Sequence, residues 1–138
     1  LMGRIIAIDY GTKRVGLATT DPSRIIASSL TTVHAKDALA WLETYCKTEE
    51  VDAFVIGKPL RLDGSDSESA VHVEKFVSSL ANRFPTKPIH RVDERFTSKI
   101  AQRSLLEMGL KKKDRQNKSN VDQLSAVLIL QTWMESNP

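Results

Sequence analysis

Acidic residues end or interrupt apolar segments at three places in the sequence, and together they could supply a metal site. Asp9 closes the first apolar run, Asp93 and Glu94 close the last short one, and Asp122 lies in the first turn of an apolar stretch over residues 121–134. Carboxylates brought together repel one another unless they coordinate cations, and an all-oxygen ligand set favours Mg²⁺ or Mn²⁺. Two such ions about 4 Å apart can activate a water molecule and stabilise the leaving oxygen of a phosphodiester. The pattern therefore predicts metal-dependent phosphodiester hydrolysis.

Each acid also has a purely structural interpretation. Asp9 could cap a hairpin turn, and the helix dipole favours Asp122 near a helix N-terminus. Asp93 or Glu94 could lie in a solvated loop; in a strand they point to opposite faces, so only one can join Asp9, and spacing does not decide which. Against the structural interpretation, Asp122 heads a stripe of small and apolar residues that we expect to face the sheet, namely Ser125, Ala126, Ile129 and Trp133.

The elements that must position these acids follow a βββαβαβα order. The first two apolar runs are separated only by YGTKR, which predicts a tight hairpin, and the turn DPSR introduces a third strand. Later apolar runs alternate with helical periodicity, so we expect their strands to be parallel. The predicted strands are 5–9, 15–20, 25–30, a run within 52–60 and 89–93, and the predicted helices are 35–46, 65–83, 97–109 and 121–134. We expect one α/β domain over residues 1–138, with a mixed five-stranded sheet flanked by helices.

The composition is typical of a soluble globular protein with a small positive charge. Hydrophobic residues make up 41% and charged residues 27% of the chain, and the net charge is +3. No apolar run is long enough to span a bilayer, which predicts no membrane association. The first residues lack the regions of a signal peptide, which predicts a cytoplasmic protein. The single Cys46 cannot form an intrachain disulfide or anchor a cysteine metal site.

Basic residues lie beside the acids and in one loop. The segment GLKKKDRQNKSN, residues 109–120, carries five basic residues and one acid. It is equally consistent with a solvated loop and with a loop that contacts phosphates. The candidates for phosphate contacts are Lys13, Arg14, Arg95, Lys111, Lys112, Lys113 and Lys118. We therefore expect a nucleic acid as the partner.

The turn DYGTKR excludes two common phosphate-binding loops. A Walker loop or a dinucleotide fingerprint needs a helix after its glycine loop, whereas a strand follows here. The turn does resemble the phosphate hairpin of the actin and sugar-kinase superfamily, which also has an acid followed by Gly-Thr. That superfamily places its nucleotide between two such folds, and 138 residues supply only one. An actin-like nucleotide-binding domain is therefore the weaker alternative.

Four motifs along the chain resemble the bacterial YqgF family of ribonuclease H-like proteins. In order, they are AIDYGTKRVGLATTD, VIGKPLRLDGS, VDERFTS and NKSNVDQLSAVLIL. The resemblance extends from near the N-terminus to the final helix and implies a ribonuclease H-like fold. It also implies that Asp9, Glu94 and Asp122 are the metal ligands, which favours Glu94 over Asp93.

The resemblance implies two nucleic-acid substrates. Members of the family are linked to maturation of the 5′ end of 16S ribosomal RNA and, by similarity to RuvC, to the resolution of Holliday junctions. RuvC-type resolvases carry an acid after their fourth strand, where this sequence has Gly57-Lys58-Pro59, and a further ligand one turn before the last Asp, where it has Ser119. We therefore predict processing of pre-16S ribosomal RNA, with the small-subunit precursor as an expected partner. Junction resolution and a non-catalytic nucleic-acid- or ribosome-binding module are the alternatives.

Overall fold

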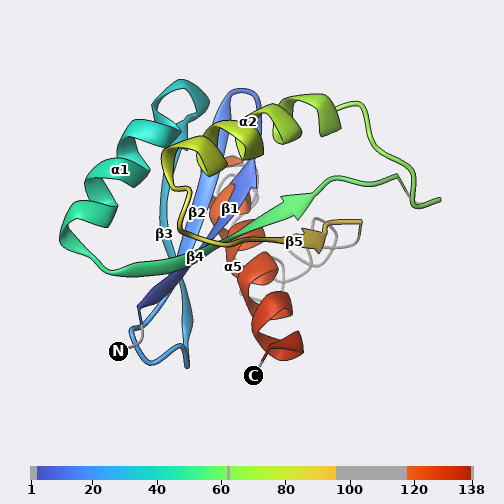
Figure 1. Ribbon diagram of the computed structural model, residues 1–138. Helices are drawn as coiled ribbons and strands as arrows, with labels where there is room; N and C mark the ends of the chain where they lie inside the picture. Colours follow the sequence, from blue (N-terminus) through green and yellow to red (C-terminus); the bar gives the residue numbers. More distant parts are fainter. Residues whose placement is uncertain (1–2, 62, 96–117, 138) are drawn as a thin grey trace.

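Five strands of the described chain form one mixed sheet. The computed structural model describes residues 3–61, 63–95 and 118–137 (Figure 1). The strands are β1 (Arg4–Tyr10), β2 (Arg14–Thr20), β3 (Ala27–His34), β4 (Val51–Lys58) and β5 (Ile89–Asp93). Their order in the sheet is β3-β2-β1-β4-β5; β2 pairs antiparallel with β1 and β3, whereas β4 pairs parallel with β1 and β5. The predicted sheet and its parallel later strands are therefore confirmed.

Helices cover both faces of this sheet (Figure 1). On one face lie α1 (Ala38–Thr48), which follows the short 3₁₀ helix η1 (Ala35–Asp37), and α2 (Ala70–Arg83). On the other face α5 (Lys118–Ser136) packs against β2, β1 and β3. The stripe predicted to face the sheet does so, since Ser125, Ala126 and Ile129 are buried. Farther along α5, Trp133 packs against His90 of β5, with ring centroids 5.0 Å apart.

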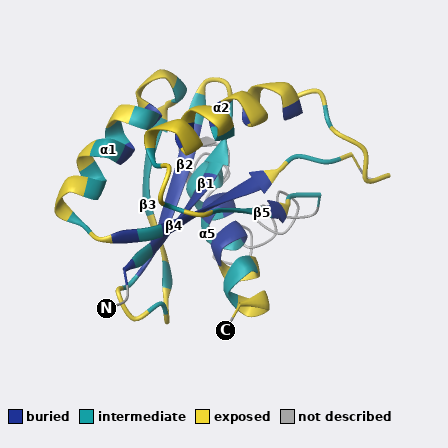
Figure 2. Ribbon diagram, viewed as in Figure 1, coloured by how far each residue is buried: buried dark blue, intermediate teal, exposed yellow. Residues whose placement is uncertain are grey.

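The side chains of β1 alternate between two apolar layers, and this alternation decides which way its terminal acid points. Ile6 and Ile8 are buried in the layer beneath α1 and α2, with Leu42, Phe54, Ile56, Val73 and Leu80. Ile5 and Ala7 are buried in the layer beneath α5, with Ala18, Val55, Ala126, Ile129 and Leu130. Successive strand residues point to opposite faces, so Asp9 lies on the α5 side. The two layers form the dark central part of Figure 2.

The third strand lies later in the chain than its predicted range of 25–30. The Asp21 carboxylate accepts hydrogen bonds from the backbone N–H groups of Ile25, at 2.7 Å, and Ile26, at 2.8 Å. These bonds hold both residues in the turn, where their side chains are 73% and 61% exposed. Pairing with β2 begins only at Ala27 and continues to His34. A prediction from apolar composition alone begins the strand too early, because it does not include the hydrogen bonds that the Asp21 side chain accepts in the turn.

The second helix was predicted from residue 65 but begins at Ala70. Gly64 has φ of +90°, and the Asp63 carboxylate accepts the backbone N–H of Ser65 at 2.9 Å, so the chain is still turning there. Asp66 then forms an isolated antiparallel bridge with Leu60. Helix α5 begins at Lys118, three residues before its predicted start at 121. The predicted helix over 97–109 lies outside the described residues.

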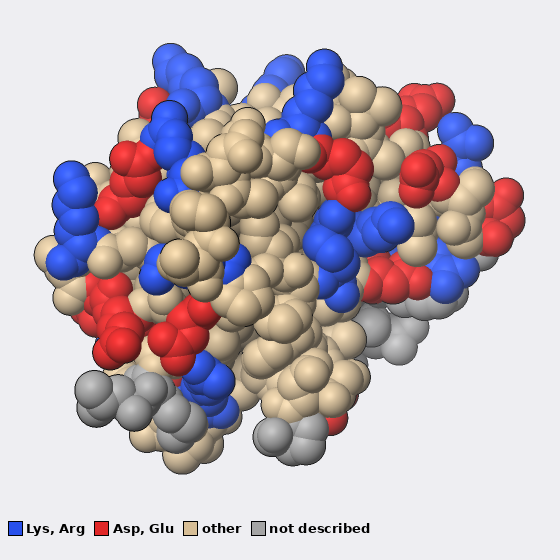
Figure 3. All heavy atoms as spheres, viewed as in Figure 1, with Lys and Arg blue, Asp and Glu red and all other residues tan. Residues whose placement is uncertain are grey.

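The face of the molecule seen in Figure 3 carries charged side chains of both signs. On the face seen in Figure 3, basic and acidic groups are interspersed around a broad area without charge. Some of these charges are paired, as in the two-pronged contact of Arg91 with Glu74, at 2.6 and 2.7 Å. None of the helices that the structure describes is long and apolar enough to cross a membrane.

Candidate functional site

Two strand-end acids and two glycines lie on the face of the sheet that α5 covers. Asp9 is paired with Gly16 across β1 and β2, and both follow the alternation that buries Ala7 and Ala18 beneath α5. Gly57 occupies the corresponding face of β4, two residues after Val55. Because Val92 of β5 is buried in the same layer, Glu94 two residues later points to that side. The carboxyl ends of the parallel strands β1, β4 and β5 therefore define the site.

The Glu94 side chain crosses β4 by passing over Gly57. A Cβ atom on Gly57 would lie 2.2 Å from Glu94 Cδ and 2.4 Å from Oε1, which is closer than real Cβ atoms approach. Over this gap Glu94 reaches Asp9, and the two carboxyl groups share a hydrogen bond. Asp93 points away from the site, since its exposed carboxylate accepts bonds from the Arg95 backbone N–H, at 2.9 Å, and from Arg95 Nε, at 2.7 Å. The contact with Asp9 thus belongs to Glu94.

Asp122 reaches the same region from α5, just beyond the first turn in which the sequence predicts it, because the helix already begins at Lys118. At this point the helix lies directly on β2. A Cβ atom on Gly16 would lie 2.2 Å from the backbone oxygen of Asp122, so only glycine allows this approach. The Asp122 carboxylate accepts a hydrogen bond from Arg14, with 3.0 Å between Nε and Oδ2. The ion pair therefore ties the start of β2 to the start of α5.

Burial and mutual repulsion change the acidity of the paired carboxyl groups. Loss of solvent raises the pKa of Asp9, and the nearby Asp122 charge raises it further, whereas the hydrogen bond from Glu94 lowers it. The pKa of Glu94 is raised to about 9, first by burial and then by the Asp9 charge and the shared hydrogen bond. Glu94 therefore holds the proton and donates it to Asp9. In the metal-free protein the pair carries one negative charge rather than two.

The raised pKa of Glu94 makes the stability of the metal-free protein depend on pH. The folded protein keeps a proton that the unfolded chain loses at its ordinary value of 4.5. The free energy of unfolding therefore falls as the pH rises from 4.5 toward 9. Glu94→Gln has no such proton to lose, so we expect the variant to gain stability relative to the wild type from about pH 5 to about pH 8. Urea unfolding in the presence of a chelator measures this difference, and a difference independent of pH would mean that folded Glu94 is ionised.

The structure describes only some of the basic residues predicted to contact phosphates. Arg14 contacts Asp122, and Lys13 is exposed in the turn before it, where its backbone oxygen accepts the N–H of Ala35 at 3.0 Å. Arg95 forms an ion pair with Asp93, and its guanidinium lies near Gly64. Lys118 begins α5 but its side chain is not among those described, and Lys111, Lys112 and Lys113 lie outside the described residues.

A pocket of about 320 Å³ opens at the acids and is lined by Asp9, Asp122 and the turn from Tyr10 to Arg14. Tyr10 forms one wall and stacks on Phe76 of α2, with ring centroids 4.6 Å apart. The pocket thus combines carboxylates with a basic hairpin turn. Within the part of the chain that the structure describes, no three acidic, His or Cys side chains are close enough together to hold a metal ion as they stand.

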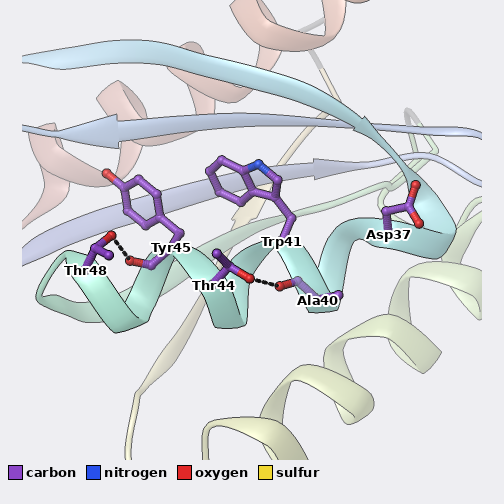
Figure 4. A pocket seen from close by; sticks show the side chains of 6 residues that line it. All are labelled: Asp37, Ala40, Trp41, Thr44, Tyr45 and Thr48. Carbon is purple, nitrogen blue, oxygen red and sulfur yellow. Dashed lines mark hydrogen bonds between the residues drawn. The ribbon is translucent and has the colours of Figure 1, made fainter.

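A separate hollow of about 420 Å³ runs along α1 and shares no residue with the carboxylate pocket. Its floor is made by the stacked rings of Trp41 and Tyr45, 5.1 Å apart and 15° from parallel, which stand side by side in Figure 4. The hydroxyls of Thr44 and Thr48 donate to carbonyls of their own helix. Among the described residues that line it, Asp37 is the single charged one. The described lining therefore lacks the paired acids that phosphodiester hydrolysis needs.

Sequence reasoning missed the role of the two glycines. Gly16 falls inside the predicted strand 15–20 and Gly57 inside the predicted run within 52–60, yet each glycine provides the space for one acid. A glycine inside a strand is itself a signal that another chain segment approaches closely. The Arg14–Asp122 pair was also missed, because its partners are 108 residues apart.

The fold defines the class of this protein as ribonuclease H-like. Thermus thermophilus RuvC bound to a Holliday junction substrate superposes with a TM-score of 0.57 over 97% of this chain and 96% of RuvC, at 13% identity. A second Thermus thermophilus RuvC structure gives a TM-score of 0.52 at 16% identity, covering 96% of both chains. At these identities the likeness concerns the fold alone.

The chain belongs to the RuvX family, the family also called YqgF, which is described as that of a Holliday junction resolvase and whose sequence profile matches residues 3–136. A relative from Amoebophilus asiaticus is 53% identical over 135 residues, covering 98% of this chain and 96% of its own. One from Christiangramia forsetii is 50% identical over 133 residues, covering 96% and 98%. Both carry the name "Putative pre-16S rRNA nuclease". The chain is thus a member of a nuclease family.

Proposed function

We propose that this protein is a divalent-metal-dependent endonuclease that processes the 5′ end of pre-16S ribosomal RNA. Asp9, Glu94 and Asp122 are its proposed metal ligands, and Mg²⁺ or Mn²⁺ is the proposed cofactor. The protein would act as a single nuclease domain in the cytoplasm, where the precursor of the small ribosomal subunit is its expected partner. The observation that carries the proposal is the carboxyl pair of Asp9 and Glu94, with Asp122 beside it.

The donor set fits a hard divalent cation. Two acids share a proton at the ends of β1 and β5, and a third lies close enough for its charge to raise the pKa of Asp9. A carboxyl pair with this much repulsion is stabilised by a cation, and its all-oxygen donors suit Mg²⁺ or Mn²⁺ rather than zinc. Bound there, the ion would supply an activated water and stabilise negative charge on the phosphate oxygens.

The chain's own residues have three tasks in this reaction. Glu94 gives up the proton it shares with Asp9, because a metal ligand must be ionised. The hairpin turn bearing Lys13 and Arg14 forms the wall of the pocket, where it would bind the phosphate backbone and orient it toward the acids. Gly57 leaves the space that keeps Glu94 against Asp9. Binding and positioning are thus divided between the basic turn and the acidic strand ends.

The names of the relatives favour RNA as the substrate. Proteins half identical to this chain over nearly its whole length carry a name that refers to pre-16S ribosomal RNA. The choice of RNA is also supported by the segment Gly57-Lys58-Pro59, which contains no acid, whereas RuvC-type resolvases carry one after the fourth strand. In this chain Gly57 has no side chain, and this leaves the space that the Glu94 side chain crosses.

Resolution of Holliday junctions is the second candidate function. The family is described by that activity, and the fold matches RuvC in a structure that contains a junction. A resolvase cuts two strands symmetrically and therefore needs a second active site. The two candidates consequently differ in their substrate, not in the proposed chemistry.

Cleavage of two labelled substrates by the purified protein tests the choice. We expect Mn²⁺-dependent cutting of a precursor 16S RNA 5′ segment, no cutting of a four-way DNA junction, and no activity in the presence of a chelator. Cutting of the junction alone would replace the proposal by the resolvase. Binding of the RNA without cutting of either substrate would favour the non-catalytic module.

A further inference from the structure

The third acid of the site, Asp122, forms an ion pair with Arg14. Arg14 begins β2, Asp122 lies just beyond the first turn of α5, and 3.0 Å separates Arg14 Nε from Asp122 Oδ2. Their side chains are 38% and 21% exposed, so the pair lies at the rim of the pocket rather than in the core. A contact of this kind can break without unfolding the protein.

Every proposed metal ligand has another partner in the metal-free protein. The side chains of Glu94 and Asp9 are hydrogen-bonded to each other, and Asp122 is paired with the Arg14 guanidinium. Among the described residues, no three acidic, His or Cys side chains are close enough together to hold an ion as they stand, although the Asp122 charge acts on Asp9. The step that completes the site is therefore the release of Asp122 from Arg14.

Once it is released from Asp122, the Arg14 side chain can pair with a second group. It lines the same pocket as Asp9 and Asp122, and it follows the exposed Lys13 in the hairpin turn. A guanidinium pairs with a phosphate through two parallel hydrogen bonds, so Arg14 can exchange a carboxylate for a substrate phosphate. Only the long side chain has to move, because its backbone is held in β2 and by the bond from Gly11 N–H to Arg14 O, at 2.9 Å.

We propose that Arg14 is an internal counter-ion that holds Asp122 until a divalent cation binds and then pairs with the phosphate backbone of the nucleic acid. This inference rests on the proposed function, because it assumes that Asp122 is a metal ligand. Arg14 competes with the cation, so it lowers metal affinity in the free protein. Since coupling between two ligands is reciprocal, metal and nucleic acid then increase each other's affinity.

Mn²⁺ affinity measured by calorimetry on the purified protein, without nucleic acid, tests this exchange. We expect Arg14→Gln to bind Mn²⁺ about three- to tenfold more tightly than the wild type, because a competing ion pair and a nearby positive charge are both removed. Lys13→Gln is the matched control, since it removes the same charge from the same turn but leaves the pair intact. We expect it to change the affinity by less than about twofold. Arg14→Gln should have no further effect when Asp122→Asn is already present.

The possible results separate this inference from the proposed function. Equal or weaker Mn²⁺ binding by Arg14→Gln, with the wild type still binding, would overturn the exchange and leave the metal site standing. Equal tightening by Lys13→Gln would also overturn it, because the effect would then come from charge alone. Absence of Mn²⁺ binding by the wild type and all variants would overturn the proposed metal site and this inference with it.

Discussion

Asp9→Asn will reduce phosphodiester cleavage by about a thousandfold or more, which corresponds to a loss of about 4 kcal/mol of transition-state stabilisation. Asp9 interacts with both of the other acids. It shares a hydrogen bond with Glu94, and the charge of Asp122 raises the pKa of Asp9. The amide keeps the shape of the carboxylate and still accepts the Glu94 proton, but it removes the charge that would bind the cation. We therefore expect the variant to remain folded. Single-turnover cleavage of precursor RNA together with thermal unfolding measures both effects.

Asp37→Asn is the matched control for this variant. It makes the same change of acid to amide at an exposed residue that lines the separate hollow on α1. We expect the control to cleave at the rate of the wild type. Wild-type activity in Asp9→Asn would contradict the assignment of the acids, and equal losses in the two variants would mean that the effect is not specific to the site.

Gly57→Ala will reduce cleavage by about a hundredfold, because a displacement of about 1 Å at a reacting group is sufficient for such a loss. The added Cβ would lie 2.2 Å from Glu94 Cδ and 2.5 Å from Cγ, so the side chain must leave its path over β4. The fold can accommodate this change, since the obstructed atoms belong to a side chain rather than to backbone. Loss of activity and of Mn²⁺ affinity, with a retained unfolding transition, is the expected combination.

Gly3→Ala provides the control for Gly57→Ala. A Cβ on Gly3 would also meet a carboxylate, at 2.5 Å from Asp52 Oδ1, but at the amino end of β1 instead of its carboxyl end. It should lower stability and leave cleavage unchanged when both are measured below the unfolding temperature. If Gly57→Ala keeps full activity, or if it loses as much stability as a substitution in the hydrophobic core would cause, Gly57 does not act through Glu94.

Much of the fold follows from local pattern. The hairpin of β1 and β2, the parallel pairing of β4 and β5 and the apolar stripe of α5 all agree with what periodicity and turn residues predict. The errors fall where a polar side chain competes with the backbone pattern. Asp21 holds Ile25 and Ile26 out of β3, and the turn at Asp63 delays α2. Such bonds depend on single side-chain conformations that apolar spacing does not encode.

The site could be predicted less fully than the fold. Spacing left Asp93 and Glu94 equivalent, and a family resemblance was needed to prefer Glu94. The structure gives a physical reason for their difference, because Val92 fixes the face of β5 and Gly57 opens the path for the residue two positions later. The partner of Asp122 could not be foreseen, since Arg14 joins it only when β2 and α5 have packed together. Side-chain contacts across the sheet are a product of packing, not of local sequence.

The most direct test of the metal site is an anomalous diffraction map of crystals soaked in Mn²⁺. The proposed three-carboxylate site predicts one or two peaks in the pocket at the carboxyl ends of β1 and β5, bound by the carboxylates of Asp9, Glu94 and Asp122. It also predicts that Arg14 has left Asp122 and that Glu94 no longer shares a proton with Asp9. A map with no peak there, with the Asp9–Glu94 hydrogen bond and the Arg14–Asp122 pair unchanged, would contradict it.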